Sequence, residues 1–121
     1  MYNSSLPALI TAVAATTTQT SADQQNLVAR GCIVVVDVTA IAATGSIVVT
    51  IQGKDPASGA YYTLVTSAAI TTVSTNVFQI YPASTVAASN YNGVLPVAWR
   101  VVVTPLNGVA ISYTVGATLQ A

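Results

Sequence analysis

The chain lacks histidine and glutamate entirely, and very few of its 121 residues carry a charge. The charged residues are three aspartates and three basic residues: Asp23, Arg30, Asp37, Lys54, Asp55 and Arg100. Enzymes that work near neutral pH usually recruit His, Glu, Asp, Lys or Cys to transfer protons or to attack carbon. Because these residue types are so scarce, the composition argues against an enzyme, and we predict no catalytic residue.

Ligands for metals and phosphates are equally scarce. Cys32 is the only cysteine, so the chain holds neither an intrachain disulfide nor a cysteine zinc cluster. Three scattered basic residues cannot neutralise many phosphates of a nucleic acid. We therefore predict no metal, no cofactor and no nucleic-acid partner, and we expect Cys32 to be a small buried apolar residue.

Long apolar runs are missing as well, although 53% of the residues are hydrophobic. A membrane-spanning helix needs about 20 consecutive apolar residues. The longest apolar stretches here are broken by Thr11 or ended by Asp37. The first residues also lack the Lys or Arg that opens a signal peptide. We therefore predict neither a membrane partner nor a secretory leader.

The low charge has a consequence for association. Charged residues make up 5% of the chain and its net charge is zero, whereas ordinary soluble domains contain about 25% charged residues. A free monomer with so few charges has little protection against association. We therefore expect neighbouring copies to cover much of its surface; the alternative is a lightly charged domain that stays alone.

In place of charge, the chain has β-branched residues in short alternating runs that are separated by turn signals. Six such runs predict strands, and a weaker one lies in residues 12–19; the six are residues 32–39, 47–52, 61–65, 75–81, 98–104 and 109–115. About seven short strands predict an all-β fold, an antiparallel β-sandwich of the Ig-like or jelly-roll-like type, with a small β-barrel as the alternative.

The first 26 residues differ in composition from the rest, because they are rich in Thr, Ser, Gln and Ala. We predict that residues 1–26 form an extended N-terminal arm and an edge strand, and that residues 27–121 form the sandwich domain. Such arms often pair with the sheet edge of a neighbouring subunit. The alternative is that this segment is a flexible tail.

Turn signals divide the predicted sandwich. Residues 53–59 combine Asp55 before proline with Gly59, which predicts a hairpin turn. The pair Asn107-Gly108 between two apolar runs predicts a two-residue hairpin. Residues 83–96 are irregular and form the longest loop, so we interpret Tyr91 and Asn92 as part of a presented surface.

Two charges interrupt otherwise apolar strands. Asp37 and Arg100 each lie in an apolar run. In the run of Arg100, the alternation places Trp99, Val101 and Val103 in the core. The simpler interpretation is that each charge faces solvent. The alternative is that one or both pair across a sheet or a subunit boundary and so fix its register. Arg30 is a third candidate for such an interface charge.

A resemblance covers about three quarters of the chain. The residues that carry it are Ala29-Arg30-Gly31, Val36-Asp37-Val38-Thr39-Ala40, Val49-Thr50-Ile51-Gln52-Gly53-Lys54-Asp55-Pro56, Ser58-Gly59, Tyr62-Thr63-Leu64, Leu95-Pro96, Trp99-Arg100-Val101 and Tyr113-Thr114-Val115-Gly116-Ala117. In these residues the chain resembles a group of small virion proteins of tailed bacteriophages, which also occur in prophages.

The resemblance implies a non-enzymatic virion structural protein. The first expectation is a capsid decoration or cement protein, made in the cytoplasm of the bacterial host and located on the capsid surface. Its implied partners are the major capsid protein and sister copies, commonly as a homotrimer. Alternatives are a tail or head–tail connector protein and, from another class, a carbohydrate- or receptor-binding β-sandwich module.

Overall fold

The computed structural model describes residues 3–83 and 89–120, and these residues form ten β-strands and no helix. The strands are β1 (Asn3–Ala15), β2 (Gln19–Thr20), β3 (Gln24–Gln25), β4 (Gly31–Ile41), β5 (Ile47–Lys54), β6 (Tyr61–Thr66), β7 (Ser74–Tyr81), β8 (Asn90–Asn92), β9 (Ala98–Pro105) and β10 (Ile111–Gln120). Among these residues there is accordingly no helix of the length and hydropathy needed to cross a membrane.

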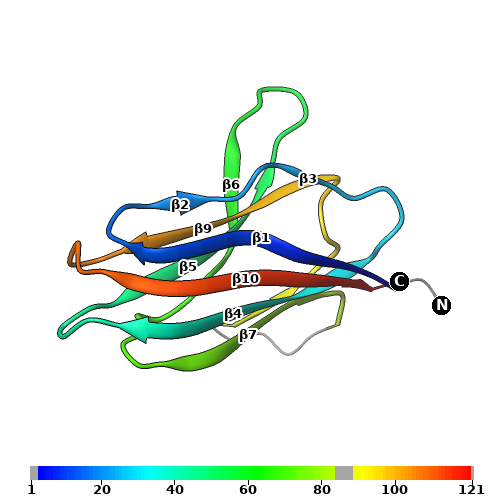
Figure 1. Cartoon of the computed structure of the whole chain (residues 1–121). Coiled ribbons are helices and arrows are strands. Elements are labelled where there is room, and N and C mark those ends of the chain that lie inside the picture. The colour runs from blue at the N-terminus through cyan, green and yellow to red at the C-terminus, as the bar shows by residue number, and fades with distance from the viewer. Residues whose placement is uncertain (1–2, 84–88, 121) are drawn as a thin grey trace.

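The strands form two sheets that pack face to face (Figure 1). Sheet A has the order β1-β10-β4-β7-β8, and sheet B has the order β2-β9-β5-β6, with β3 also paired to β9. The pairings are antiparallel except for β7 with β8, which is parallel. The predicted sandwich architecture is confirmed, with ten strands instead of about seven and with one parallel pair, and the closed-barrel alternative is wrong because the two sheets stay separate.

Alternation along each long strand separates the core from the outer faces, as the pleat of a β-strand requires. In β9, Trp99, Val101 and Val103 are fully buried, which confirms the predicted orientation of this strand. Arg100 and Val102 point to the outer face of sheet B and are half-buried. The same alternation runs through β4, β5 and β10.

The start of β4 packs tightly against β7. Cys32 is fully buried, as the sequence predicted, and burial raises the pKa of its thiol to about 12. Beside it, a Cβ added at Gly31 would lie 2.0 Å from the carbonyl oxygen of Ile80. Glycine at this position therefore lets β4 and β7 approach each other closely.

The N-terminal segment contains an edge strand, as expected, but it differs from the prediction in the arm. Residues 3–15 do not extend away from the body as an arm; they form β1, the edge strand of sheet A, which pairs with β10. Within β1, Ile10 and Ala12 join the core. The strand expected in residues 12–19 is misplaced, because β1 shifts register between Leu6 and Ile10 and again between Ala12 and Ala15. Such bulges interrupt the alternation on which the prediction depended.

The β5–β6 hairpin projects from the sandwich (Figure 1) and confirms the predicted turn. The Asp55 carboxylate accepts hydrogen bonds from the Ala57 N–H at 2.9 Å and from the Ser58 hydroxyl at 2.8 Å. Gly59 follows with a φ of 77°, a left-handed conformation that favours glycine. The carboxylate thus organises the loop from within.

The predicted hairpin at Asn107-Gly108 is wrong. Its flanking strands β9 and β10 do not pair, because β9 belongs to sheet B and β10 to sheet A. Gly108 does adopt a φ of 64°, as a tight turn requires. The local turn chemistry was therefore recognised, whereas the partners of the two strands depend on contacts that are distant in sequence.

Candidate functional site

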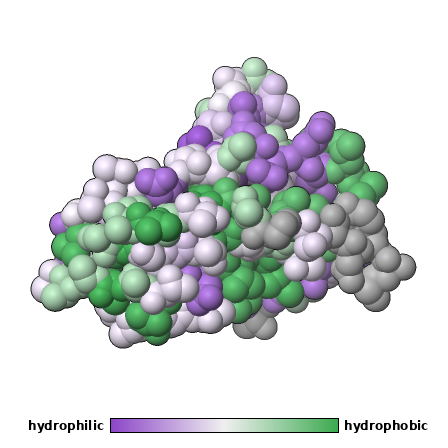
Figure 2. Space-filling view, in the orientation of Figure 1, coloured by the Kyte–Doolittle hydropathy of each residue, from purple (hydrophilic) through white to green (hydrophobic). Residues whose placement is uncertain are grey.

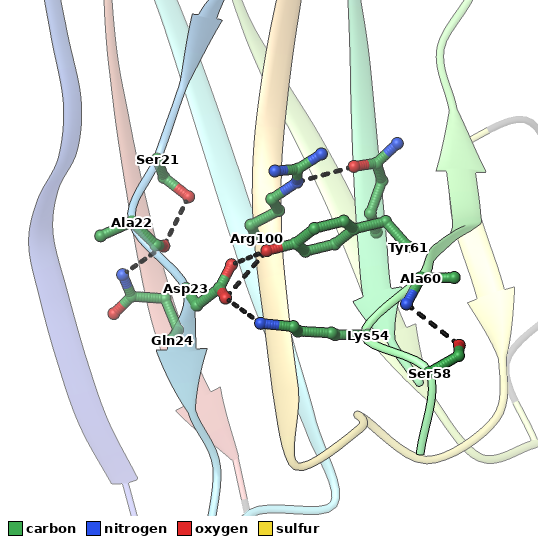
Figure 3. Close-up of polar contacts among 10 residues, drawn as sticks. Ser21, Ala22, Asp23, Gln24, Lys54, Ser58, Ala60, Tyr61 and Arg100 are labelled. Carbon is green, nitrogen blue, oxygen red and sulfur yellow. Dashed lines mark hydrogen bonds and ion pairs between the residues drawn. The ribbon is translucent and has the colours of Figure 1, made fainter. Parts of the chain in front are cut away.

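A polar cluster occupies one end of the outer face of sheet B (Figure 3). It brings together Asp23 from the β2–β3 connection, Lys54 and Tyr61 from the ends of β5 and β6, and Arg100 from β9. The strand register explains this arrangement, because Lys54 lies opposite Tyr61 and Gln52 lies opposite Arg100. Half of the charged residues of the chain thus lie in one place.

Asp23 is the centre of the cluster. Its carboxylate accepts one bifurcated hydrogen bond from the Tyr61 hydroxyl, with oxygen–oxygen distances of 2.8 and 2.9 Å, and pairs with the Lys54 ammonium at 3.1 Å. The Tyr61 hydrogen bond, followed by that of Lys54, lowers the pKa of Asp23, and Asp23 in turn raises the pKa of Lys54. Asp23 and Lys54 are 31 residues apart, so neither spacing nor motif predicted this ion pair.

Arg100 forms the other half of the cluster. Its guanidinium carbon lies 3.4 Å from the centroid of the Tyr61 ring, and its Nε donates a hydrogen bond of 2.8 Å to the Gln52 side-chain oxygen. A guanidinium stacked on an aromatic ring is held flat and in one orientation. The cluster therefore fastens the β2–β3 connection and the hairpin to β9, and it contains no free nucleophile beside a base.

Asp37 and Arg100 do not pair with each other within the chain, and each lies at an outward-facing position of its strand. Strand parity places Asp37 on the outer face of sheet A and Arg100 on the outer face of sheet B, so the core separates them. Asp37 accepts a hydrogen bond of 3.3 Å from the Thr75 hydroxyl. An ion pair across a subunit boundary stays a prediction.

The outer face of sheet A is almost free of charge. Asp37 is the one charged residue in its five strands, all of which the structure describes. The remaining outward positions are uncharged; they include Thr11, Thr114, Gly116, Thr118, Ile33, Val35, Thr75, Val77 and Gln79. In Figure 2 this side of the molecule is mostly white and green, and strongly hydrophilic atoms are few.

The other predicted interface residues lie at the far end of sheet A. Tyr91 belongs to strand β8 instead of an irregular loop, and it packs half-buried against the core. Asn92 is exposed, and its side-chain oxygen accepts a hydrogen bond of 2.7 Å from the Ala83 N–H. Residues 84–88 of the expected loop lie outside the described residues. Arg30 is exposed, and its backbone N–H and carbonyl are hydrogen-bonded to Gln120 and Leu95.

No sequence signal pointed to the role of Asn26, which is buried and links two loops. Its amide nitrogen donates to the carbonyl oxygens of Ala29, at 2.8 Å, and Leu95, at 3.1 Å. Its amide oxygen accepts from the Ala29 N–H at 2.9 Å, and its backbone N–H donates to the Val97 carbonyl. An asparagine in a polar stretch gives no sign that a loop 69 residues away will cover it.

A groove opens between the β5–β6 hairpin and the start of β9. It has a volume of about 710 Å³ and is lined by Pro56, Tyr62, Pro96 and Val97 among others. Tyr62 is 45% exposed and presents its ring there. In the part of the chain that the structure describes, no group of three or more His, Cys, Asp or Glu side chains is placed to hold a metal ion.

Comparison with known proteins identifies no family. No protein-family model matches the chain, and neither a curated protein nor a solved structure matches it significantly. The function is therefore inferred from the residues and the surfaces of the chain itself.

Proposed function

We propose that the protein is a non-enzymatic structural protein of a tailed-bacteriophage particle, namely a decoration protein that binds the major capsid protein on the outside of the head. The observation that carries this proposal is the outer face of sheet A, which has five strands and a single charge, Asp37. The phage-protein resemblance in residues 29–119 supplies the class of particle.

A face of this composition suits permanent contact. The centres of protein interfaces are depleted of charged residues, whereas exposed surfaces carry them for solubility. Thr and Val side chains on a pleated sheet offer methyl groups for packing and hydroxyls for hydrogen bonds. In a decorated capsid, such contacts, whether with the capsid subunit or with a neighbouring copy of the chain, repeat in every copy, so a modest interface in each copy stabilises the whole shell.

A second function is favoured by one observation, the exposed Tyr62 ring in the groove beside Pro56 and Pro96. An aromatic ring in a groove can stack on a sugar of a receptor glycan. Tyr61 is not available for this purpose, because Arg100 covers its ring and Asp23 holds its hydroxyl. Binding on a glycan array that Tyr62→Ala abolishes, and that Val73→Ala at another exposed site retains, would favour receptor recognition.

The decoration function is tested with particles produced with and without this chain. Particles that lack it should rupture at a lower temperature, and added purified protein should bind them saturably and restore their stability. Equal stability of the two kinds of particle, together with no binding of added protein, would contradict the proposal.

A further inference from the structure

An exposed apolar patch lies at one end of the sandwich. It consists of Leu27 and Val28, which are 76% and 66% exposed, and Val94 and Val97, which are 60% and 64% exposed. Isolated exposed aliphatic residues are ordinary, but a contiguous group of them marks an interaction site. Figure 2 shows hydrophobic atoms at the end of the molecule where the chain passes from β3 to β4.

Backbone hydrogen bonds hold these side chains side by side. The Asn26 N–H donates to the Val97 carbonyl, and the Leu95 N–H donates to the Arg30 carbonyl, at 2.6 and 2.7 Å. Ala29 and Leu95 point inward and are buried, so the valines and the leucine beside them point outward. The backbone hydrogen bonds thus hold the patch in one conformation, and little conformational entropy is lost when it binds a partner.

Arg30 stands at the rim of this patch. It is exposed, and among the described residues no ion pair engages its guanidinium. An apolar patch with an arginine at its edge is a common composition for a protein interface. Its partner should offer a flat, weakly polar surface with one accessible carboxylate.

The chain itself carries such a surface. Asp23 is held by Tyr61 and Lys54, and Asp55 is held within its own turn. Asp37 is the third aspartate. Among the described residues, it accepts one long hydrogen bond from Thr75 and forms no ion pair. It lies on the neutral outer face of sheet A next to apolar positions such as Val35.

We propose that copies of this chain associate end to face: the patch of Leu27, Val28, Val94 and Val97 on one copy packs on the outer face of sheet A of the next, and Arg30 pairs with Asp37. Charge selects this arrangement. A patch-to-patch dimer would bring two Arg30 side chains together, and a face-to-face dimer would bring two Asp37 carboxylates together. Both like-charge contacts are unfavourable, and both leave the opposite charge unpaired.

The geometry of the contact sets the kind of assembly. The interface joins two different surfaces, so it is heterologous and generates either a closed ring or an open filament. The patch lies at an end of the sandwich, whereas the surface that receives it is the outer face of sheet A (Figure 1). Each copy is therefore rotated relative to the copy before it. A rotation between successive copies is what closure into a ring requires.

The test is the mass of the purified chain in solution, which does not depend on the proposed place in a virion. Sedimentation velocity at several protein concentrations should detect a closed oligomer that weakens as salt rises. Arg30→Asp and Asp37→Arg should each raise the dissociation constant at least about ten-fold, because each places like charges at the contact. The double variant, which exchanges the charges, should restore association.

Control variants separate this contact from general effects on folding. Val28→Asp, in the patch, should dissociate the oligomer, whereas Leu106→Asp, at a similarly exposed site outside it, should leave the mass unchanged. Thermal melting of each variant checks that it is folded. A wild-type chain that stays monomeric at every concentration, or a double variant that is folded but not restored, would overturn the proposal.

Discussion

The guanidinium carbon of Arg100 lies 3.4 Å from the centroid of the Tyr61 ring, and the hydroxyl of the same tyrosine donates to Asp23. The Tyr61 side chain thus contacts the Arg100 cation with its ring and the Asp23 anion with its hydroxyl. The three residues come from β9, β6 and the β2–β3 connection, so the cluster ties the projecting hairpin to the body of sheet B (Figure 3).

Two variants of Tyr61 separate these contacts. Tyr61→Phe keeps the ring under Arg100 and removes the hydrogen bond to Asp23, whereas Tyr61→Leu removes both contacts. We expect Leu to lower the free energy of unfolding by about 0.5–1 kcal/mol more than Phe, which is the usual contribution of an exposed cation–π contact. Urea denaturation measures the difference; equal effects of the two variants would show that the stacking contributes nothing.

Acid should destabilise the protein through two carboxylates. The Tyr61 hydrogen bond lowers the pKa of Asp23, and the Ala57 N–H, followed by the Ser58 hydroxyl, lowers the pKa of Asp55. A carboxyl whose pKa is lower in the folded state stabilises the fold above its unfolded pKa, which is about 3.9, and loses this contribution as pH falls through the folded pKa.

The melting temperature should therefore fall as the pH drops below about 4. The variant Asp23→Asn/Asp55→Asn should be less stable at neutral pH and should show a shallower acid slope. A slope unchanged in this double variant would mean that other groups control the acid response.

Asn26 should be required for stability. Asn26→Ala leaves the carbonyl oxygens of Ala29 and Leu95 and the Ala29 N–H without their partner in a buried site. We expect a loss of about 1–3 kcal/mol in the free energy of unfolding. Gln25→Ala, at the exposed neighbouring position, is the matched control and should change stability by about 0.5 kcal/mol or less. Similar losses in both variants would contradict the assigned role.

Cys32 should be unreactive in the folded protein. It is fully buried, and burial raises the pKa of its thiol to about 12, so the reactive thiolate is almost absent at neutral pH. A thiol-specific reagent should label the chain only at the rate of unfolding, and at once in denaturant. Rapid labelling of the native chain would show that the start of β4 opens locally.

Regular alternation made part of the fold predictable. Trp99 and its neighbours in β9 repeat the two-residue period over a complete strand, and the structure has them in the predicted orientation. Strand β1 was misplaced because its bulges break that period. Sequence signals are local in both cases, and they fail where pairing depends on a distant strand.

The candidate site was less predictable than the fold. Asp37 and Arg100 stood out because each interrupts an apolar strand, but parity alone does not tell which sheet a strand joins. The Asp23–Lys54 ion pair and the loop contacts of Asn26 join segments that are far apart in sequence. The patch around Val28 appears only when the two loops that form it are seen together.

The most direct test of the decoration function is the copy number of this chain in purified phage particles. Quantitative mass spectrometry would measure it against the major capsid protein. A decoration protein predicts a fixed, high ratio, near parity with the capsid subunit or a constant fraction of it. A handful of copies per particle would move the protein to the tail or connector, and its absence from particles would contradict a virion function altogether.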